Sequence, residues 1–370
     1  MASINTGFSP ALHGLRGVAA LCVVVFHWYQ IFPAFGRVVG GVFPADSMLN
    51  PAAYFGFGWI GVPLFFVLSG YLLGAKVISE PITLTFVRTF WVRRCLRIYP
   101  AVWAHLICLL LAAPLVAGLV TQRALDSLAL QFLLWINMPP QMEAPISNVL
   151  WTLPIELSFY FLLPFVGLVS RKVSWYYLLL LSAVITVSWR LYWIGARELD
   201  NYVLLLPYLD MLPGTLFTFM VGYSLNFLPR IDSARHQIQG LVACAASLMA
   251  LLQWQLLMND VYWTGHWILA IWPPMIAAAV GLMVYFLNQP FIVVKPLING
   301  TMLWLGSISF GVYLWHYPIM RSMKLLQPEL WTSPVMSLVA FPIALLVTLP
   351  VASLSYKYIE QPLMGWRPIG

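Results

Sequence analysis

The chain has 370 residues, of which 61% are hydrophobic and only 8% are charged, and its formal net charge is +7. In a soluble domain about a quarter of all residues are charged, so this composition excludes a soluble globular protein and predicts an integral membrane protein. The positive charge does not indicate a nucleic-acid partner, because most of the 19 Lys and Arg residues lie between apolar runs, as in other membrane proteins.

Ten apolar stretches are long enough to cross a bilayer, which takes about 20 residues each. We therefore expect an all-α bundle of about ten transmembrane helices, forming a single domain over residues 1–370. The basic residues gather on one side of this arrangement, which predicts that both termini are cytoplasmic. A basic loop is expected between the second and third spans, and an interfacial helix at 124–135. The expected spans are 14–32, 54–75, 98–120, 148–169, 173–194, 202–227, 238–257, 266–287, 301–320 and 334–356.

The stretch Leu12–Gln30, which includes most of the first span, contains Arg16 and His27. Their spacing of eleven residues is about three helical turns, which places both side chains on one face, about 16 Å apart along the axis. Ionisable side chains inside a membrane helix are costly and are functional candidates by default. Arg16 would hold an anionic group near one interface, and His27 would move protons at depth. The alternative is that Arg16 anchors the topology and His27 bonds a neighbouring helix.

The segment Phe86–Pro100 contains a dense cluster of arginines. Guanidinium groups bind phosphate oxygens in a bidentate manner, so the cluster predicts a phosphate-rich cytosolic ligand. The alternative is a topology anchor that contacts anionic lipid headgroups. The members of the cluster are Arg88, Arg93, Arg94 and Arg97.

Two later segments carry further candidates. Glu156 follows Pro154 inside an apolar span, where a carboxylate needs a partner, and His27 and Arg16 are the obvious ones; the alternative is a structural bond between helices. His316 lies near the end of the ninth span, where a histidine among aromatic residues is also typical of an interfacial belt. Tyr313 and Ser309 precede it on the same helix face, at minus three and minus seven.

Six sequence blocks, in this order, resemble the acyltransferase-3 family of multi-pass membrane O-acyltransferases. Pro63 stands where many members carry an acidic residue, and Phe310 where a tyrosine is frequent. The chain shows no fused esterase-like domain, so we expect a stand-alone member and not a peptidoglycan-type one. The six blocks are Arg16-x10-His27, GVPLFFVLSGYLL (61–73), RRCLRIYPA (93–101), LWTLPIELSFY (150–160), SFGVYLWHYP (309–318) and YIEQP (358–362).

The resemblance implies transfer of an acyl group, usually acetyl, from cytosolic acyl-coenzyme A to a hydroxyl, without a metal, in the inner membrane of a bacterium. Arg16 and the four clustered arginines would hold the phosphates of acetyl-CoA. His27 would be the catalytic base and Glu156 its orienting partner, with an acyl-histidine route left open. The residues expected to line or support the acceptor side are Ser309, Tyr313, His316, Tyr160 and Glu360; for Glu360, an ion pair with the arginines is the structural alternative.

The acceptor remains open at this point. A hydroxyl of a cell-surface or exported glycan, a lipid-linked glycan and a small polyketide-type hydroxyl are all compatible with the sequence, and membrane lipids are expected to surround the chain. The competing class is a transporter in which Arg16, His27, Glu156 and Asp210 form a relay inside the bundle.

Overall fold

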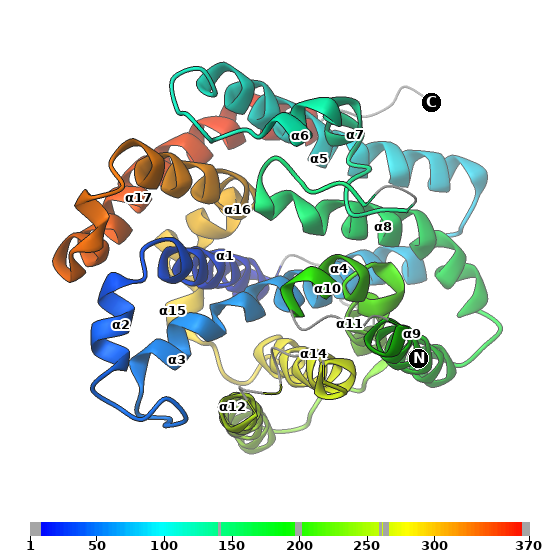
Figure 1. Ribbon diagram of the computed structural model, residues 1–370. Helices are drawn as coiled ribbons and strands as arrows, with labels where there is room; N and C mark the ends of the chain where they lie inside the picture. Colours follow the sequence, from blue (N-terminus) through cyan, green and yellow to red (C-terminus); the bar gives the residue numbers. More distant parts are fainter. Residues whose placement is uncertain (1–8, 140–141, 197–201, 259–260, 262–265, 365–370) are drawn as a thin grey trace. The chain divides into compact units, whose positions relative to one another are not determined.

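The computed structural model describes residues 9–139, 142–196, 202–258, 261 and 266–364, and every regular element within these ranges is a helix (Figure 1). Most of the connection expected between the fifth and sixth spans, and both chain ends, lie outside the described residues. The chain divides into two compact units. Unit 1 comprises residues 1–16, 62–87 and 158–304, and unit 2 comprises residues 17–61, 88–157 and 305–370.

Eight helical segments of the described chain are long and apolar enough to cross a membrane, which confirms an all-α integral membrane protein. Some of them join consecutive elements: α3 (Pro51–Gly56), η1 (Phe57–Ile60) and α4 (Gly61–Ser79) form one segment, and η2 (Asn148–Trp151) continues into α8 (Thr152–Val169). The others are α1 (Pro10–Ile31), α5 (Leu84–Ala112), α9 (Trp175–Ala196), α12 (Ala234–Leu257), α14 (Ile268–Leu287), and a segment made of α17 (Pro334–Ser355), the π-turn η5 (Tyr356–Glu360) and α18 (Gln361–Met364).

The two remaining expected spans also fold as helices, although they fall outside that set. The ninth corresponds to α16 (Gly300–Leu326), which is long enough but more polar. The sixth is broken into α10 (Tyr202–Leu209) and α11 (Leu212–Ser224), followed by the short turn η3 (Leu225–Phe227). That both cross the membrane, giving about ten spans, stays a prediction.

Two boundary predictions are wrong. The clustered arginines do not lie in a loop, because α5 begins at Leu84 and carries all four of them before it becomes fully apolar. Arginine is a good helix former, and the hydroxyl of Thr83 accepts a hydrogen bond from the backbone N–H of Phe86 at 3.1 Å, which starts the helix early. The interfacial helix expected at 124–135 is two short helices, α6 (Gln122–Asp126) and α7 (Leu128–Leu133).

In unit 2, the part of α1 from Gly17 to Ile31 contacts several other elements. A Cβ atom on Gly61 would collide with the carbonyl oxygen of Ala19, so the glycine allows α1 and the start of α4 to pack closely. Trp28 donates from Nε1 to the carbonyl oxygen of Ser337 in α17 at 2.8 Å. Gly17 packs against α16 near its start, and His27 contacts α16 near its end. The two helices α1 and α16 therefore run parallel to each other.

In unit 1, α4 and α11 pack closely against each other. Phe219 of α11 stacks between Phe66 and Phe159, with ring centroids 4.5 Å and 4.2 Å apart. A Cβ on Gly70 would collide with the carbonyl oxygen of Phe219, so the backbones of α4 and α11 approach each other at this glycine. The described chain also contains three short helical elements. They are α2 (Ala34–Gly40) and η4 (Leu330–Thr332) in unit 2, and α15 (Lys295–Ile298) in unit 1.

Candidate functional site

The centre of the site is a pair of histidines from two helices of unit 2. Nδ1 of His27 in α1 lies 2.9 Å from Nε2 of His316 in α16. His316 is fully buried, and its Nδ1 lies 2.9 Å from the carbonyl oxygen of Val312 one turn earlier. The sequence predicted each histidine as a candidate, and the structure brings them together.

The hydrogen bonds determine which ring nitrogens carry protons. A carbonyl oxygen only accepts, so Nδ1 of His316 must donate to Val312. In a neutral His316 the Nε2 atom then has a free lone pair and accepts from Nδ1–H of His27. Nε2 of His27 is consequently left without a proton, which makes it the atom able to act as a base.

Tyr317 and Asn148 join this pair, and sequence reasoning missed both. The ring of Tyr317 meets the ring of His27 edge to face, with centroids 5.0 Å apart. The side-chain amide of Asn148 donates to the hydroxyl of Tyr317 at 3.0 Å. Their only signal in the sequence is position, since Tyr317 directly follows His316 and Asn148 begins the span of Glu156.

Tyr313 ties α16 to the start of α8. Its hydroxyl donates to the carbonyl oxygen of Val149 at 2.9 Å and lies 2.8 Å from the Oγ1 of Thr152, from which it accepts. Glu156 follows Thr152 by one helical turn and is an electrostatic neighbour of Tyr313. The structure thus places Glu156 near Tyr313, and the residue that lies at Nδ1 of His27 is His316. That Glu156 acts through His27 stays a prediction.

The other expected supporting residues are buried. Ser309 donates from its hydroxyl to the carbonyl oxygen of Gly306 at 2.9 Å, within its own helix. Glu360 accepts a hydrogen bond from the hydroxyl of Ser355 at 3.2 Å. Tyr160 is buried in unit 1. That these three residues line or support the acceptor side stays a prediction.

The clustered arginines lie along the first half of α5. Arg88 is exposed, and the other three are half-buried. Arg97 donates from Nη1 to the sulfur of Met364 at 3.4 Å, and no carboxylate of the described residues lies within 4.0 Å of Arg88, Arg93 or Arg97. Positive charge along this helix is therefore not neutralised by ion pairs at these three positions. Arg16 lies on α1, the helix that carries His27.

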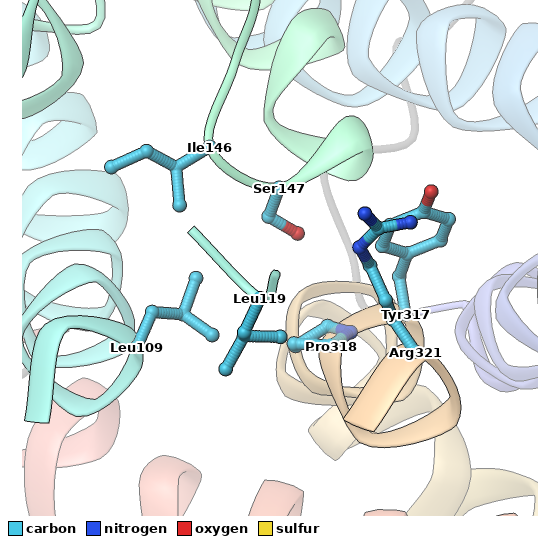
Figure 2. Close-up of a pocket in the computed structure, with 7 residues that line it drawn as sticks. All are labelled: Leu109, Leu119, Ile146, Ser147, Tyr317, Pro318 and Arg321. Carbon is cyan, nitrogen blue, oxygen red and sulfur yellow. The ribbon is translucent and has the colours of Figure 1, made fainter. Parts of the chain in front are cut away.

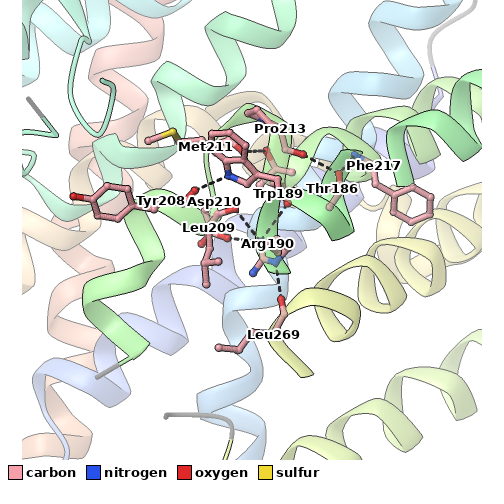
Figure 3. Close-up of polar contacts among 12 residues, drawn as sticks. Thr186, Trp189, Arg190, Tyr208, Leu209, Asp210, Met211, Pro213, Phe217 and Leu269 are labelled. Atoms are coloured by element: carbon pink, nitrogen blue, oxygen red, sulfur yellow. Dashed lines mark hydrogen bonds and ion pairs between the residues drawn. The ribbon is translucent and has the colours of Figure 1, made fainter. Parts of the chain in front are cut away.

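An ion pair with a buried guanidinium lies in unit 1. Arg190 of α9 is only 1% exposed and lies 2.8 Å from Asp210, at the break between α10 and α11 (Figure 3). Its guanidinium also donates to the carbonyl oxygens of Leu209, Gly214 and Leu269. These carbonyls and the carboxylate together satisfy the buried charge, which fits a structural role.

A bundle of apolar helices, with a hydrogen-bonded pair of histidines in unit 2, defines a multi-pass membrane protein. The family model described as an acyltransferase domain matches residues 9–357, so the chain belongs to this acyltransferase family. No solved structure matches the chain.

Three bacterial relatives are each 26% identical to this chain. The peptidoglycan O-acetyltransferase OatA of Listeria monocytogenes covers 96% of the chain, as does the O-acetyltransferase OatA of Staphylococcus aureus. The putative peptidoglycan O-acetyltransferase YrhL of Bacillus subtilis covers 97% of it. The matches take up 56%, 57% and 56% of these relatives, so the chain spans little more than half their length. These findings support a bacterial multi-pass membrane protein.

Proposed function

We propose that the chain is a membrane O-acetyltransferase that moves an acetyl group from cytosolic acetyl-CoA to a hydroxyl of a cell-wall glycan. The observation that carries the proposal is the hydrogen-bonded pair of His27 and His316 inside a domain of the acyltransferase family. The cell-wall acceptor follows from the relatives, two of which are named for peptidoglycan. They give no support to a small polyketide-type acceptor.

The acetyl donor would bind through its phosphates. The arginines of α5 offer guanidinium groups that suit phosphate oxygens, and three of them lack a carboxylate partner within 4.0 Å in the described chain. On α1, Arg16 precedes His27 by about three helical turns, or roughly 16 Å, a length that suits the pantetheine arm. The thioester would then reach the level of His27.

In the chemical step, the acceptor hydroxyl loses its proton to Nε2 of His27 while its oxygen attacks the thioester carbonyl. The new C–O bond replaces the C–S bond, and the thiolate of coenzyme A leaves and takes up the proton from Nε2 of His27, which returns to its neutral form. His316 would keep accepting from Nδ1–H of His27, and this hydrogen bond strengthens as the imidazole becomes positively charged.

The test uses purified full-length protein in detergent or vesicles, with radiolabelled acetyl-CoA and soluble cell-wall glycan fragments. We expect His27→Ala to lower acetyl transfer about 100-fold or more, because a general base contributes about that factor. The matched control is His236→Ala, since His236 is an exposed histidine of unit 1 that bonds to Asp232. Near wild-type transfer by His27→Ala, with the control also active, would place the base elsewhere.

A further inference from the structure

A third histidine of unit 2, which the proposed reaction does not use, lies near the histidine pair. His105 belongs to the second half of α5 and is fully buried. Neither of its ring nitrogens has a hydrogen-bond partner among the described residues. A buried polar group that is left unpaired lowers the stability of a fold, so a side chain of this kind calls for an explanation.

His105 packs against the helix that carries His316. Its ring meets the ring of Trp315 edge to face, with centroids 5.0 Å apart, and His316 is its electrostatic neighbour. One turn further along α5, Leu109 lines a small recess together with Tyr317, the residue after His316 (Figure 2). Three imidazoles, from α1, α5 and α16, are therefore close to one another within unit 2.

The imidazole of His105 is not held in one orientation by hydrogen bonds within the described chain. The indole N–H of Trp315, although it lies on the neighbouring ring, is also without a partner among the described residues. The last torsion of a histidine side chain has a broad energy profile. The ring of His105 can therefore turn a nitrogen lone pair towards a positive charge that forms nearby.

Such a charge forms in the proposed reaction. His27 takes up the proton of the acceptor hydroxyl, and its hydrogen bond to His316 spreads the positive charge over two rings. A charge is costly inside an apolar bundle. Polar groups that face the place where the charge develops lower this cost, and their effect is greatest where water is excluded.

We propose that His105 is a positioning residue that stabilises the protonated form of the His27–His316 pair through a ring nitrogen turned towards it. The inference rests on the proposed function and adds a third residue to its chemical step. His105 acts on the pair and contacts neither the acetyl donor nor the acceptor. Its loss should therefore lower kcat and leave KM for acetyl-CoA unchanged.

The experiment compares His105→Gln with His105→Leu in the full-length protein, using radiolabelled acetyl-CoA and soluble cell-wall glycan fragments. Both new side chains are close to histidine in size, and both lose the ring contact with Trp315, but only glutamine keeps a neutral polar group. We expect His105→Leu to lower kcat about threefold to tenfold, the effect of one hydrogen-bond-sized interaction. His105→Gln should retain more of the wild-type rate.

Thermal unfolding of the two variants in one detergent gives a second readout that opposes the first. His105→Leu removes an unpaired polar group from the interior, so it should unfold at a higher temperature than His105→Gln. The order of the two variants in stability is thus expected to be the reverse of their order in kcat. A purely structural role of His105 would give the same order in both measurements.

The matched control is Thr348→Val in α17. Thr348 is fully buried in unit 2, and its hydroxyl also has no hydrogen-bond partner among the described residues. Because this hydroxyl bonds to neither histidine of the pair, its removal should raise the unfolding temperature and leave kcat unchanged.

Several outcomes would overturn the inference while the proposed function stands. They are a wild-type kcat for His105→Leu, a kcat for His105→Gln no higher than that of His105→Leu, and a His105→Leu protein that unfolds below His105→Gln or fails to fold. A higher KM for acetyl-CoA with unchanged kcat would place His105 at the donor and would also overturn it. If the wild-type protein transfers no acetyl group, the proposed function fails and the inference fails with it.

Discussion

The imidazole of His27 depends on a chain of hydrogen bonds that starts at a backbone carbonyl. The carbonyl oxygen of Val312 fixes the proton on His316, and His316 in turn fixes the proton on Nδ1 of His27. In many enzymes a carboxylate holds the base in this way. A neutral imidazole in the same position orients the base without placing a second charge in the apolar bundle, where a charge is costly.

His316 is therefore expected to be a positioning residue, and its variants should differ in a defined way. His316→Gln keeps an oxygen that can accept from Nδ1–H of His27, so it should retain much of the transfer activity. His316→Leu removes this acceptor and leaves the backbone of Val23 as the remaining hydrogen-bond partner of the His27 ring, which should lower kcat about 100-fold with little change in KM for acetyl-CoA. Steady-state kinetics of both variants over a range of pH provide the measurement.

Equal activity of the Gln and Leu variants would show that His316 only fills space. Equal loss in both, together with loss of the thermal unfolding transition, would indicate a purely structural role. The expected pattern separates the two because only Gln preserves the hydrogen bond.

At the level of elements, glycines let helices of unit 1 pack backbone to backbone. Gly222 of α11 faces the carbonyl oxygen of Val67 in α4, and Gly70 of α4 faces the carbonyl oxygen of Phe219 in α11. Without a hydrophobic driving force between helices in lipid, such close packing is a main source of association. A single methyl group at either position would force the two backbones apart.

We therefore expect Gly222→Ala to destabilise the protein by about 1–3 kcal/mol, the usual range for overpacking. The matched control is Gly195→Ala in α9, where an added Cβ meets nothing within 4 Å. That variant should be neutral or stabilised by up to about 1 kcal/mol, because alanine favours a helix. Thermal unfolding midpoints in one detergent compare the two; equal midpoints would refute the close contact between α4 and α11.

At the scale of the whole molecule, the direction of helices limits the number of membrane crossings. Six of the eight apolar segments come after α1 and before α16. If only these six crossed, α16 would run antiparallel to α1, since each crossing reverses the chain. Within unit 2 the two helices run parallel, so an odd number of crossings must separate them. If all six apolar segments cross, a seventh crossing is needed, and the broken pair of α10 and α11 is the helical segment available for it.

This parity favours ten crossings, with both termini on the same side of the membrane. We expect a membrane-impermeant thiol reagent to label single cysteines placed in the first eight residues and after residue 364 from the same, cytoplasmic side. Leu115→Cys, an exposed position after α5, should be labelled from the opposite side. All three tests use a chain without its 4 native cysteines. Labelling of the two ends from opposite sides would overturn the predicted topology.

The sequence was sufficient to predict the helical membrane bundle, because a long apolar run has few alternatives in a bilayer. It also marked His27 and His316 as candidates, since polar side chains are conspicuous in such runs. It could not show that these residues meet, because they are 289 positions apart and contact depends on how unit 2 packs. Tyr317 and Asn148 went unnoticed for a different reason: polar residues at span ends are common, and only the contact with the ring of His27 singles them out.

The bond between His27 and His316 also bears on how the protein is made. During synthesis α1 is among the first helices to enter the membrane, and α16 is among the last. The ribosome must add 289 residues before the two imidazoles can meet. The nascent chain therefore holds His27 in the bilayer without its partner for most of its assembly, and the base acquires its orientation only when the protein is nearly complete.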